Sequence, residues 1–364
     1  MKYSISNTQL FFMMVLATLS GGTFLLVGGD ARQDAWISIL FSMALAVFQI
    51  LMYTILFSEY PKDTIITYMP KIFGRYLGNI ICFLFIIRFI YLAGRLLRDN
   101  INIMVASVIP YSSLYGIALL LFLPTVVSIY YGIENFFRIG EIVFVIFMVF
   151  LFLQYILVFI TGDIIHFGNL KPVLEKGMEP IIKQAFPDQL VFPFGTNVLF
   201  AMFFPFLNKP QKIHKTAVSA TIFTGLTLTL NVILIISVLG VDYALASISP
   251  FLDTIRHVKV GFVDRIDILS IILIVLSGFI KTTVSTFAAV IAAKQFLNFK
   301  KESKGLIIAI CAIIYFTSMF SGPNYMKHLQ IGLKVVPIYV FQLYVTVPLI
   351  ALVVHYIRKR VNEL

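Results

Sequence analysis

The sequence is poor in charged residues and in cysteine, and each shortage excludes a class of protein. Asp, Glu, Lys and Arg make up 12% of the 364 residues, well under the roughly 25% that is usual for a soluble domain. The two cysteines, Cys82 and Cys311, each lie inside an apolar run, so we expect two free thiols and no disulfide. The composition excludes an ordinary soluble domain and a disulfide-linked secreted one.

Motifs for catalysis and for metal binding are also missing. The five histidines are scattered and show no metal-ligand spacing, so we expect no metal and no cofactor. We find no phosphate-binding loop and no Ser-His-Asp set, and we expect no enzyme activity. The net charge of +11 is explained by Lys and Arg gathered in the loops on one side of a membrane, and we expect no nucleic-acid partner.

Long apolar runs dominate the chain instead. Hydrophobic residues make up 60% of it, and the mean hydropathy is +0.96. The runs are continuous, whereas barrel strands alternate apolar and polar residues. Hydropathy predicts ten spans, at about residues 8–28, 35–57, 76–106, 112–131, 138–161, 191–207, 214–241, 266–297, 305–321 and 334–357. We therefore predict an all-α polytopic membrane protein that forms a single membrane domain over residues 1–364.

The topology depends on the first run and on the distribution of basic residues. The run at residues 10–26 could be a signal peptide, but Lys2 is its only preceding charge and nine spans follow, so we interpret it as the first span. Lys and Arg are more numerous in the segments on the side of the N-terminus. By the positive-inside rule we expect both termini to be cytoplasmic.

One long outer loop separates two groups of five spans. Residues 162–190 mix apolar side chains with charges, a pattern that predicts an external amphipathic helix lying on the membrane. Such a loop is either a lid or docking surface, or a plain connection between spans. We place a first repeat at about 8–161 and a second repeat at about 191–357.

Helix-breaking residues occur in the first and sixth spans, and Pro193 directly precedes those of the sixth. The two breaks comprise Ser20, Gly21, Gly22 and Thr23 in the first span, and Phe194, Gly195, Thr196 and Asn197 in the sixth. Gly and Pro both disfavour a continuous helix. Because the two spans are five apart, the pattern predicts a 5+5 inverted repeat with discontinuous helices 1 and 6.

The main-chain groups exposed at such breaks predict a binding site. Half-helix N-termini favour an anionic group and free carbonyls favour a cation, so a zwitterion such as an amino acid suits the site. We assign the eight residues of the two breaks to ligand binding. The alternative is structural: Gly-Gly packs membrane helices closely, and Pro193 is a common first-turn residue.

The third span carries a polar stripe. Its members are Arg88, Tyr91, Arg95, Arg98, Asp99 and Asn102. At 100° per residue they share one narrow face, which we expect to point into the protein. We expect Tyr91 to contact the ligand. Arg95 and Asp99 are spaced as an i,i+4 pair that either gates a solvated pathway or fixes helix packing, with Arg98 snorkelling outward.

Lys281 lies in the middle of the eighth span, where a charge costs roughly 2.5–3.5 kcal/mol. Ser277 and Ser285 are four residues away on either side and share its face. The first and eighth spans commonly form a cation site in this architecture, so Lys281 could replace the cation or couple the protein to protons. The alternative is a lysine bound to backbone carbonyls for stability alone. Glu134 and Arg138, at the start of the fifth span, predict a structural ion pair at the membrane surface.

Five short motifs, in this order and spacing, resemble one known family. They are Ile5-Ser6-Asn7-Thr8-Gln9-Leu10-Phe11, Gln33-Asp34-Ala35-Trp36, Leu97-Arg98-Asp99, Tyr131-Gly132-Ile133-Glu134 with Arg138, and Phe192-Pro193-Phe194-Gly195. The chain resembles the B-subunits of bacterial spore germinant receptors nearly from end to end. That family belongs to the amino acid–polyamine–organocation superfamily of permeases, which has a LeuT-type fold.

The resemblance implies a function and partners. A B-subunit binds a small nutrient germinant, often an amino acid, in the inner membrane of the dormant spore, and works with an A-subunit membrane protein and a lipoprotein C-subunit. Many members are expected to have an acidic residue where this chain has Thr196, so the type of ligand is open.

Two functions from different classes remain. The first is a germinant-sensing subunit that binds a small solute, most simply an amino acid, at mid-membrane and signals to its partners. The alternative is a secondary transporter for amino acids coupled to protons through Lys281, which the fold alone does not exclude. A gated ion pathway formed with partner subunits is a third idea.

Overall fold

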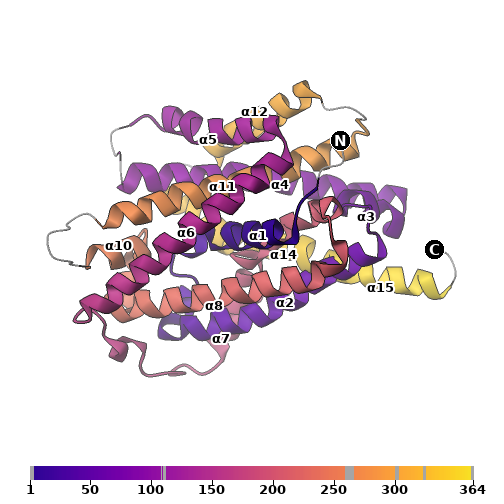
Figure 1. Ribbon diagram of the computed structural model, residues 1–364. Helices are drawn as coiled ribbons and strands as arrows, with labels where there is room; N and C mark the ends of the chain where they lie inside the picture. Colours follow the sequence, from indigo (N-terminus) through magenta and orange to yellow (C-terminus); the bar gives the residue numbers. More distant parts are fainter. Residues whose placement is uncertain are drawn as a thin grey trace.

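The computed structural model describes residues 4–107, 109, 112–258, 266–299, 303–322 and 325–361. Within these ranges the chain is helical, and the only β pairing is an isolated bridge between Ile5 and Leu207. Figure 1 shows long helices lying side by side, with both termini at one end of the molecule. The all-α fold is as predicted.

Seven segments of the described chain are long and apolar enough to cross a membrane. Their helices are α2 (Ala35–Glu59), α4 (Arg75–Ser107), α5 (Leu114–Tyr131), α6 (Ile133–Thr161), α8 (Ile213–Leu239), α11 (Asp267–Phe296), and a C-terminal run of α13 (Tyr325–Gln330), η7 (Ile331–Val335), α14 (Val336–Phe341), η8 (Gln342–Thr346) and α15 (Val347–Arg360). η7 and η8 are π-helical turns within this run. The protein is a multi-pass membrane protein.

The other three predicted spans are short or broken. They correspond to α1 (Asn7–Gly22), to α12 (Lys304–Phe320), and to a sixth segment whose core is η4 (Phe194–Met202). α1 and α12 contain 16 and 17 residues, fewer than the usual 20 of a membrane span. The ten predicted spans therefore correspond to seven long helical segments and three segments that are short or broken.

α1 is broken inside the protein, as predicted. Ser20 leaves the helical region with ψ of 124°, and Gly21 adopts φ of 80°. This left-handed conformation carries no steric cost for glycine. The chain then forms turns and the 3₁₀ segment η1 (Gly29–Asp34) before α2 begins.

The sixth segment is also discontinuous, and its second half differs from an α-helix. The chain approaches through α7 (Glu179–Lys183) and the π turn η3 (Gln184–Gln189), both in the predicted external loop, and then forms 3₁₀ turns in η4 and η5 (Phe204–Phe206). Proline at positions 193 and 205 lacks the N–H that an α-helix needs. The predicted loop also contains η2 (Phe167–Leu170), and the boundaries of the two repeats stay a prediction.

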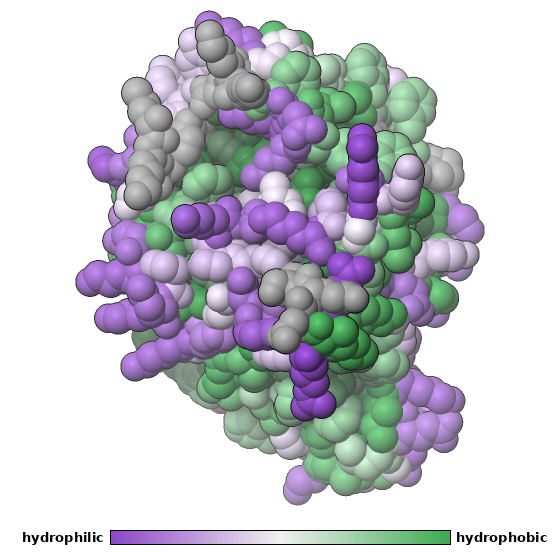
Figure 2. Space-filling model, turned by 90° about the vertical axis from the view of Figure 1, so that its right-hand side faces the viewer, coloured by the Kyte–Doolittle hydropathy of each residue, from purple (hydrophilic) through white to green (hydrophobic). Residues whose placement is uncertain are grey.

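The broken segments form the centre of the fold. Every side chain from Met13 to Leu19 of α1 is completely buried, and α1 packs against α6, α8 and α11 (Figure 1). Apolar side chains on the periphery are exposed, such as Leu120 at 71% and Ile308 at 67%, as expected of surfaces that face lipid. Figure 2 shows the end with the termini, where hydrophilic side chains gather across the face.

The remaining short helices cap the two ends. α3 (Ile65–Phe73) lies at the end with the termini, and α10 (Pro250–Arg256) lies at the other end. α9 (Val241–Ala246) packs on α8 and η1, and α7 packs on α2 and η1. The 3₁₀ turn η6 (Pro210–Lys212) leads into α8. α3 packs directly on the start of α4, where Cys82 donates its S–H to the Ile66 carbonyl at 3.1 Å.

This α3–α4 contact predicts the effect of a single methyl group. A Cβ on Gly78 would lie 2.4 Å from the Pro70 Cα atom, so Gly78→Ala should destabilise the protein by about 1–3 kcal/mol through overpacking. The measurement is the melting temperature in detergent. Gly116→Ala in α5 is the matched control, because the nearest atom to its Cβ is 3.9 Å away. Equal melting temperatures for the two variants would show that α3 does not rest on α4 at Gly78.

Candidate functional site

Lys281 of α11 lies where the two broken segments meet. Its side chain is buried, with 2% of the residue exposed, and Nζ donates a hydrogen bond to the Ser20 carbonyl at 3.1 Å. The break in α1 makes this carbonyl available, because the Phe24 amide donates to Gly21 instead of to Ser20. Lys281 also lies 5.1 Å from the centre of the Phe192 ring, in cation–π geometry. The cation is thus held by a freed carbonyl and an aromatic face.

Two small cavities adjoin Lys281. The first has a volume of about 80 Å³, and Thr196 and Gly195 form part of its wall. The second, of about 50 Å³, is lined by Ser20, Gly21 and Ser277. Lys281 and Phe192 line both. Because one water molecule takes up about 10–15 Å³ of such a cavity volume, the first cavity accommodates a solute of a few heavy atoms.

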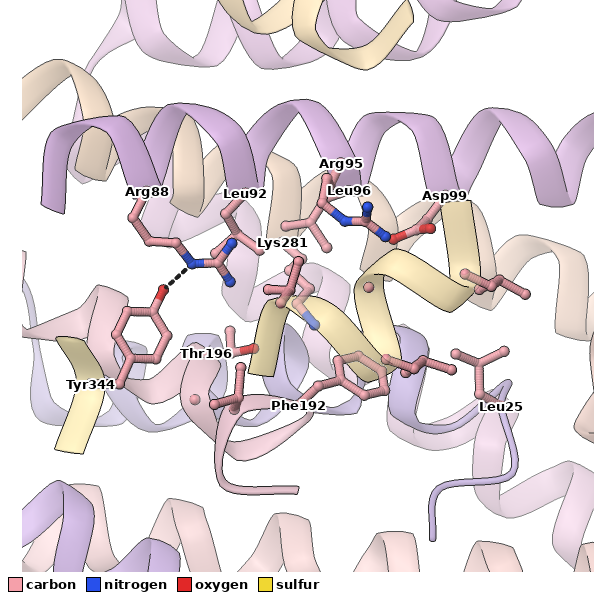
Figure 3. Close-up of a pocket in the computed structure, with 16 residues that line it drawn as sticks. Leu25, Arg88, Leu92, Arg95, Leu96, Asp99, Phe192, Thr196, Lys281 and Tyr344 are labelled. Carbon is pink, nitrogen blue, oxygen red and sulfur yellow. Dashed lines mark hydrogen bonds between the residues drawn. The ribbon is translucent and has the colours of Figure 1, made fainter. Parts of the chain in front are cut away.

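The polar stripe of α4 forms one wall of the first cavity. Figure 3 shows Arg88, Arg95 and Asp99 pointing from α4 toward the cavity, opposite Thr196 and Phe192. The guanidinium of Arg88 donates from Nε to the Tyr344 hydroxyl at 3.1 Å. Four charged residues line the first cavity, and three of them, Arg88, Arg95 and Lys281, are cations.

Arg95 and Asp99 both bind His328, at the start of the C-terminal run. Arg95 donates from Nη2 to the His328 carbonyl at 2.7 Å, and Asp99 Oδ1 lies 2.6 Å from His328 Nε2. The two residues that were predicted as an i,i+4 pair therefore meet through α13. Gly332 permits this approach, because a Cβ at this position would lie 2.3 Å from Arg95 Nη2.

Two guanidinium groups in this wall keep unused donors. Arg88 and Arg95 are about nine-tenths buried, with 9% and 6% exposed. In each of them Nη1 is buried and has no hydrogen-bond partner among the described residues. A buried, unsatisfied charged donor is costly, so the cavity favours an occupant that accepts hydrogen bonds.

Several predicted ligand residues support the site without lining these cavities. Asn197 accepts a hydrogen bond from Thr18 and donates one to Thr221, both at 3.2 Å, and so connects the two broken segments to α8. Thr23 uses its carbonyl to accept from Asn231 at 2.7 Å. Gly22 packs on Leu228 and Pro193, and Phe194 is fully buried.

The remaining predicted residues have other surroundings. Tyr91 lies outside the lining of both central cavities and stacks near Arg95, whose Cζ is 5.9 Å from its ring centre. Ser277 and Ser285 donate back to carbonyls of α11, at Leu273 and Lys281. Arg98 is buried in the protein.

Glu134 and Arg138 form the predicted i,i+4 ion pair at 2.9 Å, with both side chains at least 40% exposed. Such exposed pairs contribute at most about 1 kcal/mol.

Four residues that line the first cavity or bind its lining residues were missing from the sequence-based assignment of the site. Arg88 belonged to the recognised stripe, and Phe192 belonged to a recognised motif. Tyr344 and His328 lie in the C-terminal run, which begins at Tyr325, earlier than the predicted start at 334. The arginines of the stripe are buried cations, and buried cations need partners from another helix. This need was the sequence signal that could have predicted partners such as Tyr344 and His328.

A third cavity, of about 210 Å³, leads from the site toward the end with α9 and α10. It shares Leu25 and Phe192 with both central cavities, and its wall includes Asp30, Asp188 and Lys334. Burial raises the pKa of Asp188 to about 6, and Asp30 adds to the rise while Lys334 opposes it. We call this cavity the vestibule.

Comparison with known proteins gives consistent matches over nearly the whole chain. A family model described as "Spore germination protein" matches residues 4–325. Spore germination protein KB of Bacillus subtilis (strain 168) is 32% identical over 100% of this chain and 97% of its own length. Spore germination protein YndE of the same organism is 25% identical over 98% of this chain and 97% of its own length.

A solved transporter structure shares the fold. The crystal structure of MhsT in complex with L-phenylalanine superimposes with a TM-score of 0.66 and 12% sequence identity, covering 94% of this chain and 89% of that one. The predicted LeuT-type architecture, with discontinuous helices 1 and 6, is thereby confirmed.

The charges around the cavities predict an energetic coupling between Asp99 and Lys281. Asp99→Asn should lower stability, because it removes the carboxylate that faces three cations. Adding Lys281→Met should cost less than the sum of the two single losses, giving a coupling of about 0.5–3 kcal/mol in a double-mutant cycle of denaturation. Glu134→Gln is the control for loss of an exposed pair. Strictly additive single effects would mean that Asp99 and Lys281 do not interact.

Proposed function

Because the chain belongs to the family of spore germination proteins, we propose that it is the nutrient-sensing subunit of a spore germinant receptor. Its ligand is a small solute, in the simplest case an amino acid, that binds in the cavity between Lys281, Thr196 and the stripe of α4. The observation that carries the proposal is the buried cavity at the junction of two broken segments. This is the place where a LeuT-type protein can offer main-chain groups to a solute.

Binding would signal by changing how the broken segments and α4 pack on the C-terminal run. The cavity is lined by Thr196 of the sixth segment and by Tyr344 and Gly332 of the C-terminal run. A ligand that contacts both segments favours the conformation in which they are close, and a partner subunit in contact with that conformation senses the shift. We propose the A-subunit and the lipoprotein C-subunit as the partners, and the spore inner membrane, with both termini cytoplasmic, as the location.

Lys281 has a structural explanation in this proposal. Its ammonium group occupies the space between α1 and α11 and binds the Ser20 carbonyl, as a bound cation would. The break in α1 is therefore stabilised without an ion. Ser277 and Ser285 leave their hydroxyls on the backbone of α11, which agrees with a site that a lysine already fills.

The second candidate, a proton-coupled amino acid transporter, is favoured by the vestibule that leads to the same cavities. Uptake of labelled amino acid into proteoliposomes distinguishes the two. The receptor proposal expects saturable binding without accumulation, whereas accumulation that an imposed pH gradient drives and that Lys281→Met abolishes would establish transport.

Filling the cavity tests the location of the site. Thr196→Trp should remove the response of spores to the nutrient, or raise the required concentration at least about tenfold, because the indole occupies a cavity of about 80 Å³. The measurement is the germination dose–response curve at matched protein level. Leu120→Trp is the control, since Leu120 is 71% exposed on the periphery of α5. An unchanged curve for Thr196→Trp would place the ligand elsewhere.

A further inference from the structure

The cavity next to Thr196 has an imbalance of charge that the proposed function does not explain. Arg88, Arg95 and Lys281 line it, and Asp99 is the sole carboxylate among the described residues of its lining. One oxygen of Asp99, Oδ1, already contacts His328. Cations outnumber carboxylates whatever the protonation state of that histidine.

The bonds made within the protein leave part of this positive charge unsatisfied. Arg88 uses Nε on Tyr344, Arg95 uses Nη2 on His328, and Lys281 uses one of its three N–H bonds on Ser20. The Nη1 groups of both arginines are buried without a partner among the described residues. Both arginines therefore have donors left for a negatively charged group, and Figure 3 shows the head groups of Arg88 and Lys281 directed into the cavity that Thr196 lines from the opposite side.

Acceptors for an amine are few among the described residues of the same wall. An α-amino group needs a carboxylate or several free carbonyls. Asp99 already places Oδ1 on His328 of α13, which leaves one carboxylate oxygen, and position 196 supplies a neutral hydroxyl. The Ser20 carbonyl already accepts from Lys281. The cavity thus offers a ligand more charged hydrogen-bond donors than acceptors.

We propose that this cavity is an anion subsite, in which Arg88 and Lys281 bind the carboxylate of a small ligand and an amine is not required. The inference rests on the proposed function, because it assigns the class of ligand to the same site. The volume of about 80 Å³ fits a carboxylate on a chain of a few heavy atoms. A chloride ion has the same recognition chemistry, and the experiment separates the two sources.

The test uses the full chain purified in nanodiscs in a chloride-free buffer, with the melting temperature as the readout of binding. The probes are propionate, L-alanine, L-alaninamide, glucose and chloride. We expect propionate and L-alanine to bind with similar affinity, and alaninamide and glucose to bind at least about tenfold more weakly, since they lack the charged acceptor. Stabilisation by chloride alone, with no effect of propionate, would assign the subsite to an inorganic anion and overturn the carboxylate assignment.

Arg88→Gln provides the residue-level test. It should weaken propionate binding about tenfold or more, whereas Arg138→Gln, which removes an exposed guanidinium that does not line the cavity, should leave it unchanged. If Arg88→Gln does not fold, the comparison of propionate with alaninamide on the unmodified protein decides the question.

Two results overturn the subsite, and they are distinguishable from failure of the proposed function. Equal binding of alaninamide or glucose, abolished by Thr196→Trp, would show a nutrient site that does not need an anion. Lack of saturable binding by every probe would remove the anion subsite, while the spore dose–response of Thr196→Trp would still report separately on nutrient sensing at this position.

Discussion

The hydrogen bond from Lys281 to the Ser20 carbonyl is the interaction on which the rest of the site depends. It joins α11 to the point where α1 stops being a helix. A cation at mid-membrane costs roughly 2.5–3.5 kcal/mol. A hydrogen bond from a charged donor returns about 1.5–3 kcal/mol, and the Phe192 ring adds up to about 2 kcal/mol if it is desolvated. The lysine is therefore close to balanced, and the break in α1 is held by a covalently attached cation.

The cost of the other two cations is not balanced in the same way. Arg88 and Arg95 are each hydrogen-bonded through one nitrogen to the C-terminal run, and each keeps another nitrogen buried without a partner in the described part of the chain. Breaking or omitting one partner of a buried charge is expensive, and evolution rarely retains such groups without a use. The helices around the cavity are thus stably packed, while two buried guanidinium groups beside it have donors without partners among the described residues. This combination is typical of binding sites.

Much of this arrangement could be predicted from local sequence features. Gly21 disfavours a continuous helix and Lys281 places a charge in a long apolar run, and both residues line the second cavity. The α4 stripe was recognisable because its members share one helical face. These predictions succeeded because the physics involved is local: backbone freedom, helical periodicity and the cost of charge in lipid.

The parts that could not be predicted depend on contacts between distant segments. Nothing near Tyr344 indicates that its hydroxyl meets Arg88, and nothing near His328 indicates that it receives both Arg95 and Asp99. Hydropathy started the last span at 334 and so left His328 in a loop, although the helical run begins at Tyr325. The sixth segment forms 3₁₀ turns because it contains prolines and is closely packed in the interior. A hydropathy window does not detect this conformation.

A cryo-EM map of the protein in nanodiscs, recorded with saturating nutrient, tests the central claim most directly. The account predicts α1 interrupted at Ser20 and Gly21, the Lys281 ammonium on the Ser20 carbonyl, and ligand density between Arg88, Thr196 and Lys281. A continuous first helix with Lys281 turned elsewhere, or ligand density remote from this cavity, would contradict it.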